Sequence, residues 1–148
     1  MSNLIENTHF LKSKFSRSFL DSICKSNFEF GYDSLADIFI REHLAENSLT
    51  KTWINEIFIE NFRDIGITTG ILRVIAHLDY REIAPQGLTI ALAALSHSSA
   101  EVRECGIRAF ENWSTSEGLE ILRTVKCKEK WLQDYVDQVI IDIEKEDR

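Results

Sequence analysis

The stretch Ile83–Trp113 reads IAPQGLTIALAALSHSSAEVRECGIRAFENW, and it decides the fold of this 148-residue chain. Its apolar residues recur at three- and four-residue steps on both sides of a polar corner, which is the spacing of one helix face. In the corner, residues 97–101, Ser98 or Ser99 is the expected N-cap, and Glu101 or Val102 opens the second helix. The stretch therefore predicts two helices joined by a tight turn. Its apolar positions are Leu88, Leu92 and Leu95 in the first helix, and Val102, Gly106, Ile107, Phe110 and Trp113 in the second.

The same helical spacing continues on both sides of this stretch. Ser34 is an expected cap, and Asp37 follows it three positions later as in a capping box. Gly66 is expected to end a helix, and Thr68 or Thr69 to start the next. Residues 1–7 are expected to form a loose terminus. The predicted helices cover residues 8–25, 34–46, 51–63, 68–79, 117–124 and 129–145, with Thr8 and Thr50 as further caps, so that the chain has seven or eight helices and no strand.

Two groups of apolar residues in the first third of the chain are expected to pack in the core. The helix over residues 34–46 is expected to bury Leu35, Ile38, Phe39 and Leu44. Between it and the preceding helix, residues 27–33 are interpreted as a linker. Its aromatic residues are expected to pack back onto the helices, and they are Phe28, Phe30 and Tyr32.

An internal repeat is visible at a period of thirty residues. Shifting the central helix pair by thirty positions sets Leu92 on Leu122, Val102 on Leu132 and other apolar residues on apolar residues. A helix pair that cannot cover its own apolar face must stack on a neighbour, so consecutive pairs predict a solenoid.

The order Ala84-Pro85, Leu92, Leu95, polar corner, Val102-Arg103 and Ile107 resembles a HEAT repeat. In that family each repeat is two antiparallel helices, the first often bent near a proline. The resemblance is specific over residues 84–113, fair over 116–146 and weak over 50–79. It implies an all-α fold, a right-handed HEAT-like α-α superhelix of about three helical hairpins over residues 50–146. N-terminal capping helices over residues 8–49 complete one domain, 1–148.

The last repeat departs from the family pattern at two positions. Gln133 stands where the family has arginine, and Asp137 where it has an apolar residue. Terminal repeats often deviate because one face meets solvent. Arg103 matches the pattern, and we expect it to bond acidic side chains or carbonyls in adjacent turns as part of the scaffold.

The charge of the chain narrows the classes of partner. The formal net charge is −7, whereas nucleic acids and anionic membranes call for clustered lysine and arginine. No secretory signal and no apolar run of about 20 residues occurs in the sequence. The three cysteines have no metal-type spacing, and Cys105 is expected to act as a small core residue. A cytoplasmic location is the expectation.

The first predicted helix leaves an alternative open. Lys12, Lys14 and Arg17 lie among its apolar residues, and a basic amphipathic helix of this kind can dock on a membrane or a partner. Three positive charges are few, and Asp21 offsets one. A capping helix of the core is therefore the favoured interpretation.

Groups that converge on a reaction are scarce. His9, His43, His77 and His97 lie on different predicted elements, and none is paired at i and i+4. HEAT-repeat hydroxylases bind iron through repeated His-Glu pairs, but here Glu42-His43 is reversed and single. HEAT-like DNA glycosylases bind DNA through a basic surface, which the acidic balance of this chain disfavours. The best local basic cluster is only Arg123, Lys126, Lys128 and Lys130. Small HEAT-like proteins can also act as bilin lyases, but no residue of this chain indicates a tetrapyrrole pocket. We expect no catalysis, no cofactor and no metal.

The resemblance points instead to protein binding, because the second helices of HEAT repeats line a concave face. Most of the residues expected on this face are acidic, and an acidic face attracts basic partners and speeds their association. A face that is merely solvated is the plainer interpretation. We expect a non-catalytic protein-binding module, specifically an immunity- or antitoxin-type inhibitor of a basic toxin or nuclease. The alternative is a small HEAT-like enzyme or ligand-handling protein. The expected partner-binding residues are Arg73, His77, Glu101, Glu104, Arg108, Glu111, Asp134, Asp137, Gln138 and Asp142.

Overall fold

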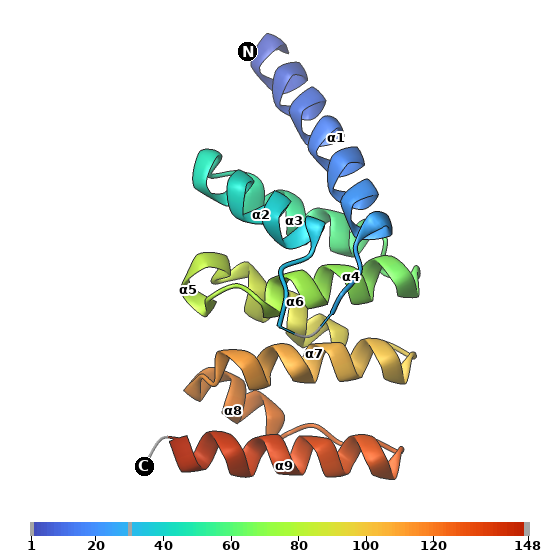
Figure 1. The fold of residues 1–148 in the computed structure, drawn as a ribbon, viewed down its shortest axis with the longest axis vertical. Coiled ribbons are helices and arrows are strands. Elements are labelled where there is room, and N and C mark those ends of the chain that lie inside the picture. Colours follow the sequence, from blue (N-terminus) through green and yellow to red (C-terminus); the bar gives the residue numbers. More distant parts are fainter. Residues whose placement is uncertain (1, 30, 147–148) are drawn as a thin grey trace. The chain divides into compact units, whose positions relative to one another are not determined.

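The computed structural model describes residues 2–29 and 31–146, and these residues form nine α-helices and no strand (Figure 1). The prediction of an all-α fold is confirmed. The chain divides into two compact units, Met1–Val74 and Ile75–Arg148, with the boundary inside the fourth helix. The helices are α1 (Ser2–Lys25), α2 (Leu35–Glu46), α3 (Thr50–Glu60), α4 (Ile65–Ala76), α5 (Tyr80–Ile83), α6 (Gln86–Ala94), α7 (Ala100–Trp113), α8 (Ser116–Leu122) and α9 (Lys130–Glu146).

The first unit is built on the apolar stripe of α1. Phe15 and Phe19 are buried where α1 packs against α2 and α3. The Phe15 ring lies 5.5 Å from that of Phe39 and 5.4 Å from that of Trp53, measured between ring centroids. Clustered aromatic rings of this kind dominate the stability of a small core. The C-terminal half of α1 therefore belongs to the core of the first unit.

The first turns of α1 differ from the prediction of a loose terminus. The helix begins at Ser2, so the described residues before Thr8 are helical. Thr8 is not the cap, because its hydroxyl donates to the Leu4 carbonyl 2.9 Å away inside the helix. Leu4 and Ile5 continue the apolar stripe of α1 but are exposed, so the helix extends beyond its buried part.

The start of α2 is as predicted, but its buried face is so only in part, because Phe39 packs on Phe15 whereas Leu35 and Ile38 stay exposed. The Ser34 hydroxyl accepts from the Asp37 backbone N–H at 3.1 Å, and the Asp37 carboxylate accepts from the Ser34 N–H at 2.8 Å. This reciprocal pair is the expected capping box. Leu35 and Ile38, however, are 57% and 48% exposed, because the helix turns Ala36 and Ile40 inward instead.

The linker before α2 follows the prediction only in part. Phe28 is half-buried, and the Arg73 guanidinium lies 5.5 Å from the centroid of its ring. This cation–π contact ties the linker to α4. Tyr32 is exposed rather than packed, and Phe30 lies outside the described residues.

The boundary between α3 and α4 also differs from the sequence-based assignment. Asp64 accepts from the Ile67 backbone N–H at 3.0 Å, so it caps α4 in the way expected of Thr68 or Thr69. Gly66 lies in the first turn of α4 and does not end a helix. The Thr68 hydroxyl donates back to the Asp64 carbonyl, and α4 ends at Ala76 rather than near Asp79.

A similar shift occurs at the start of α3. Leu49 takes the N-cap position expected of Thr50. Thr50 is the first helical residue, and its hydroxyl donates to the His43 carbonyl at 3.0 Å. In both places a threonine bonds to a carbonyl instead of capping the backbone, an alternative that its side chain always offers.

The second unit contains two helix pairs with the same offset. Helices α6 and α8 begin at residues 86 and 116, and α7 and α9 begin at residues 100 and 130, so each is displaced by thirty residues. Ser99 caps α7 as predicted, with its side chain accepting from Val102. Gly106 lets α7 approach α6, since a Cβ there would meet Ala94 Cβ at 3.0 Å and the Ala91 carbonyl at 3.2 Å.

The three cysteines carry free thiols and differ in accessibility. Cys105 is buried in α7, which confirms it as a core residue. Cys24 is exposed near the end of α1, and Cys127 is partly exposed in the turn before α9. The two units therefore each present one accessible thiol.

Candidate functional site

A polar surface of the second unit lies on α7 and α9. The two helices run side by side in the same direction, with their N-terminal ends together (Figure 1). On α7 the residues Val102, Gly106, Ala109 and Trp113 are buried, which leaves one polar side through Glu104, Arg108 and Glu111. The amphipathic spacing of α7 thus fixes which side chains reach solvent.

A hydrogen-bonded network joins these side chains to α9. Arg108 donates to Glu104 across one helical turn at 2.9 Å. Its guanidinium also interacts electrostatically with the Tyr135 hydroxyl, and that hydroxyl donates to the Glu111 carboxylate at 2.9 Å. Networks that cross between helices hold their members in one arrangement better than isolated surface pairs do. Tyr135 lies within the apolar spacing of α9, so the sequence pattern carries no sign of its place in this network.

Tyr135 remains protonated over the physiological range. Partial burial of the side chain raises the pKa of Tyr135 to about 12, with the Glu111 carboxylate adding to the rise and Arg108 opposing it. A neutral phenol keeps its O–H as a donor, and this donor is what the Glu111 carboxylate requires.

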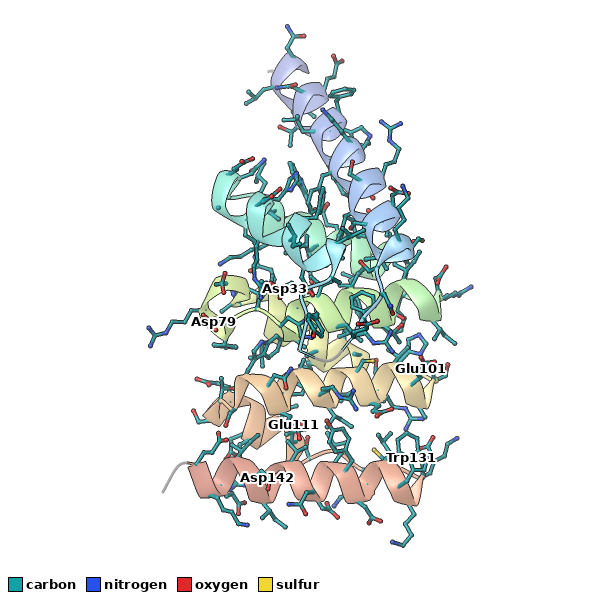
Figure 2. All side chains as sticks on the ribbon, viewed as in Figure 1. Asp33, Asp79, Glu101, Glu111, Trp131 and Asp142 are labelled. Atoms are coloured by element: carbon teal, nitrogen blue, oxygen red, sulfur yellow. The ribbon has the colours of Figure 1, made fainter. Side chains whose placement is uncertain are left out.

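The network continues along the same side of α9. Gln138 and Asp142 follow Tyr135 at three- and seven-residue steps, and the Gln138 amide donates to Asp142 at 2.9 Å. Trp131 precedes Tyr135 by one turn, and its side chain is 53% exposed. Figure 2 shows Trp131 and Glu101 at the N-terminal ends of α9 and α7, and Asp142 and Glu111 towards their C-terminal ends. We call this surface the α7/α9 face, defined by Glu104, Arg108, Glu111, Trp131, Tyr135, Gln138 and Asp142.

Two predicted partner-binding residues of α9 point elsewhere. Asp134 pairs with Lys130 at 2.9 Å, and Asp137 accepts from Gln133 at 3.0 Å. By helical spacing both lie on sides of α9 different from that of Tyr135. The structure therefore does not bring Asp134 and Asp137 into the network.

The remaining predicted residues lie around the face or in the other unit. Glu101 is exposed in the first turn of α7, and His77 is exposed just after α4. Arg73 belongs to the first unit, where it covers the Phe28 ring. The face therefore unites five of the ten predicted residues, namely Glu104, Arg108, Glu111, Gln138 and Asp142.

Arg103 holds the start of α9 in place. Its guanidinium donates to both oxygens of Glu129, at 2.8 and 2.6 Å, in a two-bond contact. This bond lowers the pKa of Glu129 to about 2. Glu129 directly precedes α9, so the pair fixes the entry of α9 relative to α7. The scaffold role expected of Arg103 is confirmed.

Few described side chains converge in a way that supports catalysis. In residues 2–29 and 31–146 no group of three or more His, Cys, Asp or Glu side chains lies close enough to hold a metal ion. A cavity of about 640 Å³ lies beside Tyr80, Trp113 and Thr115. Thr115 caps α8 through Gly118 at 3.0 Å, so its hydroxyl is already engaged.

The described histidines do not assemble with one another either. His97 is buried, and its Nδ1 accepts from the Ser99 backbone N–H at 3.0 Å. His43 packs on Phe39 with 4.1 Å between ring centroids, and its Nδ1 lies 2.9 Å from the Phe39 carbonyl. These two histidines have structural roles in separate units.

No helix in the described part of the chain is long and apolar enough to cross a membrane. Comparison of the chain with protein-family models, with curated proteins and with solved structures finds no match. Inference about function therefore rests on the geometry of the α7/α9 face.

Proposed function

We propose that the chain is a non-catalytic protein-binding module and that the α7/α9 face is its binding surface. The network through Glu104, Arg108, Tyr135 and Glu111 carries the proposal. It presents charged and aromatic groups on two helices in a fixed arrangement, which lowers the entropy cost of binding. The cytoplasmic setting expected from the sequence belongs to the same proposal.

A HEAT-like stack is the architecture we propose for this surface. The thirty-residue offset between α6–α7 and α8–α9, together with the side-by-side second helices, supports it. In such a stack α7 and α9 are the equivalent second helices of successive repeats. The α7/α9 face then corresponds to the surface that repeat proteins use for partners.

The charge of the second unit supports a basic partner. Residues 75–148 contain nine basic and fourteen acidic residues, so they account for five of the seven net negative charges. Complementary charge raises association rates and disfavours acidic competitors. We therefore propose an immunity- or antitoxin-type inhibitor that neutralises a basic toxin or nuclease.

Two double variants with the same change in net charge test the surface. Glu104→Gln with Asp142→Asn alters the α7/α9 face, whereas Asp134→Asn with Asp137→Asn alters other sides of α9. In a pull-down from native lysate, the partner should be lost with the first variant and retained with the second. The captured protein should be basic, and its toxic or nuclease activity should fall stoichiometrically on addition of this chain.

Two results would contradict the proposal. Equal retention by both variants would show that the α7/α9 face is not the binding surface. Stoichiometric iron or zinc in the purified protein would favour the alternative, a small HEAT-like enzyme or ligand-handling protein.

A further inference from the structure

Trp131 differs from the other two tryptophans in its surroundings. Trp53 and Trp113 are 5% and 9% exposed, and Trp113 donates its indole N–H to the Leu78 carbonyl at 3.1 Å. Trp131 is 53% exposed on the polar side of α9. An exposed tryptophan on a charged face contributes little to the fold but is well suited to binding a partner.

The face already binds one guanidinium group. Arg108, itself exposed, donates to the Glu104 carboxylate at 2.9 Å and interacts electrostatically with the Tyr135 hydroxyl. This pair shows that a carboxylate of the face can hold a planar cation, next to an aromatic residue of α9. This internal arginine indicates the chemistry that the surface accepts from outside.

Trp131 lies one turn before Tyr135 on α9, and Glu104 one turn before Arg108 on α7, so a second aromatic residue and a carboxylate lie at the same end of the face. Because α7 and α9 run in the same direction, a step of four residues back from Arg108 and Tyr135 leads to Glu104 and Trp131. An arginine side chain can stack its planar guanidinium on an indole while its N–H groups bond a carboxylate. A lysine ammonium is not planar and is less suited to making both contacts at once.

We propose that the α7/α9 face selects arginine in its partner: the guanidinium of a basic protein segment stacks on Trp131 and pairs with Glu104. This inference rests on the proposed function, since it names the chemistry of the partner at the same surface. Arg108 competes for Glu104 in the free protein, so the incoming guanidinium displaces or shares that contact.

Binding of nona-arginine and nona-lysine peptides to the full chain tests this selectivity. The two peptides have equal charge, so an acidic surface alone would bind them alike. Stacking on an exposed indole should give nona-arginine a preference of about three- to tenfold, measured by calorimetry at moderate salt. Acrylamide quenching of tryptophan fluorescence should fall on binding, because Trp131 becomes covered.

Variants on two different sides of α9 locate the effect. Trp131→Ala should reduce the preference to about twofold or less, and Trp131→Phe should keep part of it. Ile141→Ala, at an exposed apolar residue on another side of α9, should leave the preference unchanged. Arg108→Ala should strengthen nona-arginine binding about two- to fivefold, because Glu104 loses its internal competitor.

The outcomes separate this inference from the proposed function. If both peptides bind equally and the Glu104→Gln, Asp142→Asn variant weakens both, arginine selection is wrong while the acidic binding surface stands. If neither peptide binds, arginine selection is wrong as well. If nona-arginine is preferred but Trp131→Ala keeps the preference, the stacking site lies elsewhere and the inference fails.

Discussion

At the scale of single residues, Gly106 sets the distance between α6 and α7. A methyl group at this position would lie 3.2 Å from the Ala91 carbonyl oxygen, a backbone atom that cannot turn aside. Overpacking of this kind usually costs about 1–3 kcal/mol, against about 1 kcal/mol gained from the higher helix propensity of alanine. We predict that Gly106→Ala lowers the free energy of unfolding by up to about 2 kcal/mol in urea titration.

Gly66→Ala is the matched control for this substitution. The nearest atom to a Cβ at Gly66 is the Asp64 carboxylate oxygen, at an ordinary contact distance of 3.5 Å. Its free energy of unfolding should stay constant or rise by up to about 1 kcal/mol. Equal effects of the two substitutions would show that α6 and α7 can move apart without loss.

The Arg103–Glu129 pair makes the stability of the folded chain depend on pH in the acid range. The pKa of Glu129 is lowered from 4.5 to about 2, so the folded state binds fewer protons there than the unfolded state. The contribution of the pair is therefore complete above pH 4.5 and is lost as pH falls towards 2. Thermal melting of the wild type and Glu129→Gln should show a difference that shrinks across this window.

Glu120→Gln is the control for the acid effect, because Glu120 pairs with Arg123 at an exposed position. Exposed pairs contribute little, so this variant should melt within about a degree of the wild type near pH 7. A Glu129→Gln protein that melts like the wild type at pH 7 would contradict the role given to the pair.

At the scale of elements, the capping box is the feature that starts α2. Ser34 is 5% exposed, and its hydroxyl and backbone both bond to Asp37. Loss of an N-cap side chain typically costs about 1 kcal/mol, and here a buried N–H also loses its partner. We predict that Ser34→Ala lowers the free energy of unfolding by about 1–2 kcal/mol. Ser18→Ala, at an exposed position in α1, should change it by less than about 0.5 kcal/mol.

The elements were predictable wherever local chemistry alone decides them. Apolar spacing predicts α7 and α9, and Ser34 and Ser99 mark true helix starts because their caps bond within the next three residues. The start of α4 was assigned to Thr68 or Thr69 instead of Asp64, because Asp and Thr can both cap a helix and only the folded backbone shows which residue does. Leu35 and Ile38 were expected in the core, but the packing of α2 against its neighbours buries Ala36 and Ile40 instead.

The site was less predictable than the helices. Glu104, Arg108 and Glu111 follow from the polar side of α7, which periodicity defines. The place of Tyr135 in the site could not be predicted, because a tyrosine in an apolar pattern can be either a core residue or a hydrogen-bond donor. Its bond to Glu111 joins residues 24 positions apart, and local spacing carries no information about such a pair.

At the scale of the whole molecule, charge should control how fast a basic partner arrives. The net charge of −7 attracts cations over distances of about 10 Å at 0.1 M salt, and added salt screens this attraction. We predict that the association rate of nona-arginine falls about tenfold between 20 and 300 mM NaCl in stopped-flow fluorescence. A rate that does not change would contradict electrostatic steering, whereas dissociation should change much less.

The accessibility of the thiols has a practical consequence. Cys24 is exposed in the first unit, Cys127 is partly exposed in the second, and Cys105 is buried. Maleimide dyes should therefore react with Cys24 and Cys127 and spare Cys105 in the folded protein. Cys24 and Cys127 are thus attachment sites for a donor dye and an acceptor dye in energy-transfer spectroscopy, with one site in each unit. A partner that rearranges the two units on binding would register as a change in transfer efficiency, without any engineered cysteine.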